Sequence, residues 1–142
     1  MNKIAIVFFA IVALNSCSQK SESDKTDKND KAIDARKQTC MDLRNGTFKY
    51  CNPESGRFII TRKGKLQIER DTVSGFEVRG SVKWKSYCEY ELTFIGSSNP
   101  KDKKNIGKKL NSEIIDVDGD TLTIKSVLEG KELEFKMIKI KE

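Results

Sequence analysis

From Gly46 to the end of the chain, apolar and polar residues alternate in short runs separated by turn-forming residues. An alternation with a period of two places successive side chains on opposite faces, which is the pattern of a half-buried β-strand. Three turn pairs join neighbouring runs: Lys63-Gly64, Asp118-Gly119 and Glu129-Gly130. Because such short connections form tight hairpins, the pattern predicts an antiparallel sheet.

We expect about eight strands, over residues 46–50, 57–61, 65–70, 76–85, 87–95, 110–117, 121–127 and 132–140. Strands joined in chain order favour an up-and-down arrangement, and closure removes the exposed edges of the sheet. The predicted fold is therefore mainly β, a small antiparallel meander barrel or half-barrel. Within it we expect an interruption at Gly80, a bulge at Met137-Ile138 and one solvated loop over residues 97–109.

The chain begins with the features of a secretory signal peptide. Lys3 precedes an apolar run over residues 4–14, which is shorter than the stretch of about 20 residues that a membrane-spanning helix needs,. Leu14-Asn15-Ser16-Cys17 then resembles a bacterial lipobox, which implies cleavage before Cys17 and attachment of lipid to its thiol. An ordinary signal peptide with a chance cysteine at its end is the alternative.

The sequence divides into three parts. Residues 1–16 are the expected signal peptide, 17–38 the lipidated cysteine and a flexible tether, and 39–142 the β domain. The tether is highly charged and nearly free of apolar residues, so it cannot bury enough surface to offset the entropy of ordering. A short helix starting at Asp30 is expected where the tether meets the domain.

Three cysteines accompany Cys17 in the mature chain: Cys40, Cys51 and Cys88. Exported proteins meet oxidising conditions in which such thiols pair. We expect Cys40 to bond to Cys88, which leaves Cys51 reduced, and a Cys51–Cys88 bond is the rival pairing.

Several classes of chemistry lack their residues. The chain has no histidine, which removes Ser-His-Asp and Cys-His catalysis and the usual zinc enzymes. The Asp116–Asp120 segment departs from the spacing of a calcium loop, and Glu69, Glu77, Glu89 and Glu91 are expected on outer, solvated faces. We therefore expect no enzyme activity, no metal and no cofactor.

A basic cluster lies within the expected long loop: Lys101, Lys103, Lys104, Lys108 and Lys109. Aromatic residues that could stack on bases are not interleaved there, so no nucleic-acid partner is expected. The large aromatics, including Phe58, Phe76 and Phe94, are expected to fill the core, with Tyr87 the most exposed. Polar and aromatic residues that recur on neighbouring strands give one candidate binding face: Arg62, Gln67, Trp84 and Tyr90.

Five segments of the domain resemble a family of small lipoproteins from Bacteroidota, especially flavobacteria. They are Cys40-Met-Asp-Leu-Arg-Asn-Gly-Thr-Phe-Lys-Tyr50, Ile60-Thr-Arg62, Gln67-Ile-Glu69, Val82-Lys-Trp84 and Cys88-Glu-Tyr90-Glu-Leu92. The resemblance implies a small lipoprotein and no particular activity. A DNA topoisomerase IV description, which such sequences sometimes carry, does not fit a lipidated 142-residue chain without an ATP-binding loop.

These features predict a lipid-anchored protein of the bacterial cell envelope, at the outer membrane and facing either the periplasm or the surface. Its partners would be membrane lipid through Cys17 and an envelope protein or small ligand. Two functions remain open: a binding or interaction module, and a structural or stress-related envelope component that needs only its surface and anchor.

Overall fold

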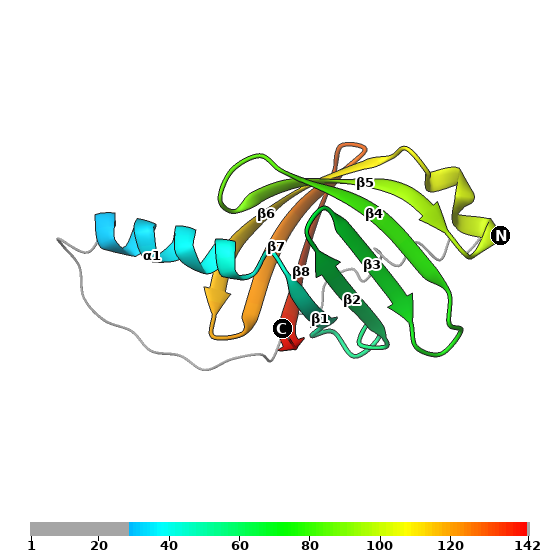
Figure 1. Ribbon diagram of the computed structural model, residues 1–142, viewed down its shortest axis with the longest axis horizontal. Coiled ribbons are helices and arrows are strands. Elements are labelled where there is room, and N and C mark those ends of the chain that lie inside the picture. The colour runs from blue at the N-terminus through cyan, green and yellow to red at the C-terminus, as the bar shows by residue number, and fades with distance from the viewer. Residues whose placement is uncertain (1–28, 142) are drawn as a thin grey trace.

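The computed structural model describes residues 29–141, which form one helix followed by a β-barrel. Helix α1 spans Asn29–Asp42, and a short turn joins it to the first strand (Figure 1). The eight strands are β1 Gly46–Tyr50, β2 Phe58–Lys63, β3 Leu66–Asp71, β4 Glu77–Trp84, β5 Glu89–Ser97, β6 Lys109–Asp118, β7 Thr121–Leu128 and β8 Lys131–Lys141. The expected signal peptide and Cys17 lie outside the described residues.

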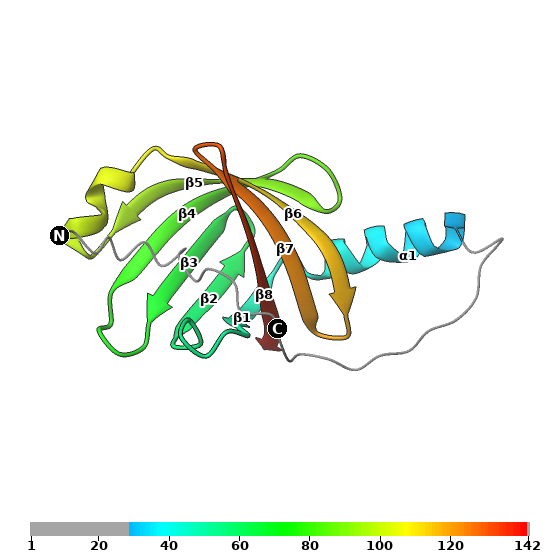
Figure 2. The ribbon, with the colours of Figure 1, turned by 180° about the vertical axis from the view of Figure 1, so that it is seen from behind.

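Each strand pairs antiparallel with the next one in the chain, and β8 also pairs with β1, so the sheet closes. Figure 2 shows β8 lying between β7 and β1 at this closure. A closed sheet removes the free strand edges that favour aggregation. The predicted meander barrel is confirmed, and it is a full barrel.

The hairpin turns use backbone conformations that their residues favour. Gly64 and Gly119 adopt positive φ angles of 59° and 58°. Glu129 and Gly130 form the whole connection between β7 and β8, with φ angles of 50° and 79°. Positive φ at both central residues is the requirement of a type I′ turn, whose twist matches that of the strands it joins. The turn pairs therefore set the order of the sheet.

Strand β4 runs through Gly80 without the expected interruption, although its register with β5 shifts between Arg79 and Gly80. A Cβ atom at Gly80 would overlap the side chain of Leu92 on β5. The glycine is thus needed because the backbone of β4 and a buried leucine approach closely there.

The expected bulge at Met137-Ile138 is wrong. Both residues keep a regular register with β7. The register shifts instead between Thr47 and Phe48 of β1, opposite the end of β8. Ile140 then points to solvent with 51% of its surface exposed, so the apolar residues at this end of β8 do not all belong to the core.

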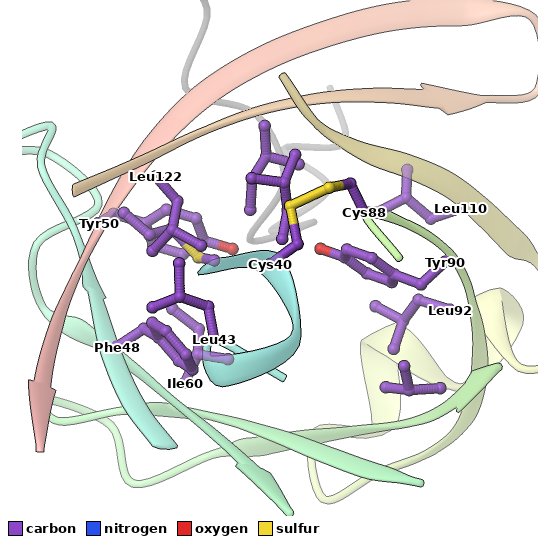
Figure 3. Packing of buried hydrophobic residues seen from close by; sticks show 14 of the residues in the cluster. Cys40, Leu43, Phe48, Tyr50, Ile60, Cys88, Tyr90, Leu92, Leu110 and Leu122 are labelled. Carbon is purple, nitrogen blue, oxygen red and sulfur yellow. A yellow bond between two sulfur atoms is a disulfide. The ribbon is translucent and has the colours of Figure 1, made fainter. Parts of the chain in front are cut away.

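The C-terminal end of α1 closes one end of the barrel. Cys40 is fully buried and Leu43 is 5% exposed, and Figure 3 shows both side chains among the core residues of the barrel. Cys40 forms a disulfide with Cys88, just before β5, with 5.2 Å between the Cα atoms. The predicted pairing is confirmed, and Cys51 is outside any disulfide. The helix end is therefore both packed and covalently fixed.

The segment expected as a solvated loop contains the 3-10 helix η1, Pro100–Asn105. The side chain of Asn99 accepts a hydrogen bond from the backbone N–H of Lys101 and so caps its first turn. Asp102 and Asn105 are buried. This segment is ordered and packs at the end of the barrel away from α1 (Figure 1).

Candidate functional site

The inward face of β3 is polar, which is unusual for a barrel of this size. Gln67, Glu69 and Asp71 are 7%, 4% and 9% exposed, whereas Leu66 and Ile68 alternate with them on the outer face,. The expectation that Glu69 is a solvated outer residue is therefore wrong.

The register of the β2–β3 hairpin explains this inversion. Residues directly opposite in an antiparallel pair share one face of the sheet. Ile60, which is fully buried, lies opposite Glu69, and Phe58 lies opposite Asp71. Because the apolar residues of β2 must face the core, their partners on β3 face it too.

Arg62 lies opposite Gln67 and is the largest fully buried side chain of the described residues, at 1% exposure. Its Nε donates to Oε1 of Gln67 at 3.0 Å, and its Nη2 donates to the hydroxyl of Tyr90 at 3.2 Å. Within residues 29–141, no carboxylate forms an ion pair with Arg62, and its Nη1 has no hydrogen-bond partner.

Aromatic rings surround this guanidinium. Its Cζ lies 4.7 Å from the ring centroid of Tyr90, 5.4 Å from that of Phe48 and 5.8 Å from that of Trp84. Ring faces attract a cation, and more strongly when water is excluded. Trp84 also contacts Arg44, whose Cζ lies 4.5 Å from the centroid of the indole. Two arginines therefore lie close to one tryptophan.

The structure brings together all four residues of the predicted binding face, because the rings of Trp84 and Tyr90 also contact each other, tilted at 49° with centroids 4.9 Å apart. Arg62, Gln67 and Tyr90 are buried in the barrel and Trp84 is partly buried. Arg62, Gln67 and Tyr90 are too deeply buried to meet a solvent-borne ligand without rearrangement. Their arrangement is that of a polar network that stabilises the core.

A cavity of about 40 Å³ lies at the end of the barrel away from α1, where β3 ends and β4 begins. Its polar lining consists of Glu69, Asp71, Asp102, Arg57, Ser74 and Asn99, and its apolar lining of Phe58, Phe76 and Val78. Phe76 was expected to fill the core, but it is 44% exposed and stands at the rim. The cavity has room for only a few water-sized groups.

Glu69 is the most deeply buried acid of this cavity. The hydroxyl of Tyr50 donates to its Oε2 at 3.2 Å, and among the described residues nothing donates to its Oε1. Burial disfavours the ionised form and raises the pKa of Glu69 from its ordinary 4.5 to about 8, although the bond from Tyr50 opposes this rise. Burial, with Glu69 nearby, also raises the pKa of Tyr50 well above its ordinary value.

The pKa of Asp71, two residues further along β3, is shifted in the opposite direction. Burial raises its pKa, but backbone N–H groups of Val73 and Ser74 and the charge of Arg57 outweigh this effect, so the pKa lies below its ordinary value. The guanidinium of Arg57 lies 3.2 Å from Oδ2 of Asp71 and rests over the ring of Phe58. Asp71 is therefore an ionised, fully occupied carboxylate.

Asp102 reaches the cavity from η1. Burial raises its pKa, while hydrogen bonds from Ser97 and Asn99 and the charge of Lys104 lower it less strongly. The hydroxyl of Ser97 donates to its Oδ2 at a long 3.4 Å. The cavity lining thus contains three carboxyl groups and one paired guanidinium, so it is rich in oxygen atoms that can accept hydrogen bonds.

The alternation of the sequence does not predict this site. It gives no signal for Arg57, Asp71 or Asp102, and it places Glu69 on the outer face instead of the inner one. The turn was predicted at Lys63-Gly64, but it lies at Gly64-Lys65, and this shift by one residue is what places Glu69 opposite Ile60. The position of Asp102 has no comparable signal, because it depends on how η1 packs.

The comparisons with known proteins identify no relative: no protein family matches the chain, and no curated protein or solved structure is significantly similar to it. In the part of the chain that the structure describes, no helix is both long and apolar enough to cross a membrane. Over residues 29–141, no three acidic or cysteine side chains gather in a group suited to a metal ion.

Proposed function

We propose that this chain is a lipoprotein of the bacterial envelope, anchored through an acylated Cys17, whose barrel binds a small ligand at the cavity beside Glu69. The proposal keeps the expected resemblance to small Bacteroidota lipoproteins and moves the binding site from the Arg62 cluster to this cavity.

The anchor is supported by the sequence. An apolar run too short to span a bilayer ends at Leu14-Asn15-Ser16-Cys17,. A lipid-bearing Cys17 would hold the barrel at a membrane surface. The disulfide between Cys40 and Cys88 is consistent with export, since such bonds persist mainly in oxidising compartments.

The binding role rests on one observation. Glu69 lines a cavity and is 4% exposed, yet its Oε1 lacks a hydrogen-bond partner within the described residues. A buried polar atom without a partner costs about 1–3 kcal/mol, and buried polar groups are normally satisfied by protein, water or ligand. A barrel that needed only its surface and anchor would gain stability from an apolar residue at this position.

Metabolic labelling with a palmitate analogue tests the anchor. The wild-type protein and a Cys51→Ser variant should incorporate the label and sediment with membranes. A Cys17→Ser variant should do neither, and labelling of that variant would refute the anchor.

Nuclear magnetic resonance tests the binding role. The ¹⁵N-labelled protein is titrated with small amines, carboxylates, sugars and phospholipid headgroups, while the amide signals of Ser74, Phe76 and Asn99 are followed. At least one class should move these signals saturably. If none does so at millimolar concentration, the cavity is not a binding site.

A further inference from the structure

We propose that the cavity beside Glu69 takes the primary ammonium group of a small organic amine, with the apolar part of the ligand resting on the aromatic rim. This inference rests on the proposed function and assigns the class of ligand to the same site.

The residues that line the cavity favour a ligand group that donates hydrogen bonds. Glu69, Asp71 and Asp102 each present carboxyl oxygens to one cavity, while Arg57 is already paired with Asp71. An anion would lie beside the carboxyl group of Asp102, and the one cation of the lining, Arg57, is already paired, so like charges would repel there. An ammonium group brings three N–H donors and one positive charge, which suit the unpartnered Oε1 of Glu69 and the carboxyl group of Asp102 in the same lining.

The size of the cavity limits the head group. About 40 Å³ holds about three water-sized groups,, so a primary ammonium group fits with little room to spare. A trimethylammonium group would occupy the whole of this volume, and it has no N–H to donate to Oε1 of Glu69,. The cavity should therefore distinguish primary from quaternary amines.

The exposed apolar side chains beside the cavity favour a ligand with an apolar substituent. Phe76 lines the cavity with 44% of its surface exposed, and Val73, in the same β3–β4 connection, is 76% exposed. An aromatic or alkyl substituent would cover these side chains, and the phenyl rings also attract a nearby cation. An arylalkylamine such as 2-phenylethylammonium joins both features in one small molecule.

Protonation of Glu69 gives a second readout. The groups that face it are Tyr50 from β1, Asp71 on β3, Asp102 from η1 and Arg57 before β2. Because burial raises the pKa of Glu69 to about 8, the empty protein carries a neutral carboxyl group at pH 7. An ammonium ion stabilises the ionised form, so binding should release a proton and should strengthen from pH 6 to pH 8.

The test is a calorimetric titration of the full-length purified protein with 2-phenylethylammonium, 2-phenylethanol and 2-phenylethyltrimethylammonium. We expect saturable binding of the primary amine, at least tenfold weaker binding of the alcohol and none of the quaternary amine. Heats measured in two buffers of different ionisation enthalpy should show net proton release at pH 7.

Two variants locate the site. Glu69→Gln keeps the shape and the bond from Tyr50 and should weaken amine binding at least tenfold and abolish proton release. Glu132→Gln removes an exposed carboxylate on β8 that pairs with Lys125 and should bind like the wild type. If Glu69→Gln does not fold, as judged by circular dichroism, Asp102→Asn and Phe76→Ala take its place, and each should weaken binding.

The outcomes separate the two proposals. If another ligand class moves the signals of Ser74 and Phe76 while the amine does not bind, the amine inference is overturned and the binding role stands. If no class binds, both are overturned. Equal amine affinity in the wild type and Glu69→Gln would place binding elsewhere and overturn the inference.

Discussion

The hydroxyl of Tyr50 donates a hydrogen bond to Oε2 of Glu69 at 3.2 Å, and both side chains are buried within the barrel. This pair joins β1 to β3 across the inward face of β2. Since burial favours the neutral form of a carboxyl group, the pair holds a proton that the unfolded chain would release at neutral pH.

Stability should therefore decrease with increasing pH. The folded protein keeps the Glu69 proton up to about pH 8, whereas the unfolded chain releases it near the ordinary pKa of 4.5. Between these values the folded state binds more protons, so the free energy of unfolding falls, by at most about 1.4 kcal/mol per pH unit. Urea denaturation from pH 4 to pH 9 measures this slope.

Glu69→Gln should flatten that profile because an amide does not titrate. Glu132→Gln, which alters an exposed ion pair, should leave the slope unchanged. A Glu69→Gln profile as steep as that of the wild type would show that another group carries the proton.

Breaking the disulfide should destabilise the barrel. Cys40 and Cys88 are 48 residues apart, and closing a loop of this length contributes about 4 kcal/mol in the chain-entropy model. We expect a Cys40→Ala/Cys88→Ala protein to lose about that much stability, measured by denaturation without reductant. Cys51→Ala, which leaves the bond intact, should change stability much less.

Arg62→Ala should destabilise the core by about 2–4 kcal/mol, because it leaves a void and removes the partners of Gln67 and Tyr90,. Trp84 is the only tryptophan, so its emission reports the loss of the neighbouring charge. Arg44→Ala removes the second cation beside the indole. It should change the emission as well, but cost under about 1 kcal/mol. Equal stability losses in both variants would argue against a core role for Arg62.

Gly80→Ala should cost about 1–3 kcal/mol, because the added methyl group overlaps the buried side chain of Leu92,. Gly96→Ala is a matched control, since nothing lies within 4 Å of a Cβ atom at that position. Thermal unfolding of both variants compares them. Leu92→Val in the Gly80→Ala background should recover part of the loss if steric overlap is its cause.

The barrel could be predicted from the sequence because the conformation of each tight turn depends on the turn residues themselves. Residues such as Gly64 and Gly119 require no tertiary information to adopt their conformations, and hairpins in chain order leave few ways to arrange the strands. The sequence left two pairings open, Cys40–Cys88 and Cys51–Cys88, and the structure shows the first, in which the buried end of α1 meets the start of β5.

The polar inner face of β3 was not predicted because alternation has two possible phases. On β3 the apolar residues are Leu66 and Ile68. If they faced the core, Gln67 and Glu69 would lie on the outer face. The structure follows β2 instead, whose Phe58 and Ile60 fix the inward face of the hairpin. The burial of Phe58 and Ile60 on β2 thus determines which face of β3 points inward, although the apolar residues of β3 itself favour the opposite face.

The bond between Cys40 and Cys88 also determines how the barrel responds to mechanical force. A load arriving along the chain from the N-terminal side reaches Cys40 before it reaches β1, and the covalent bond passes it to the start of β5. Strand β1 is therefore not peeled away from β2 and β8 one hydrogen bond at a time. In the oxidised protein, tension from the N-terminal side is therefore borne first by a covalent link between the end of α1 and the start of β5.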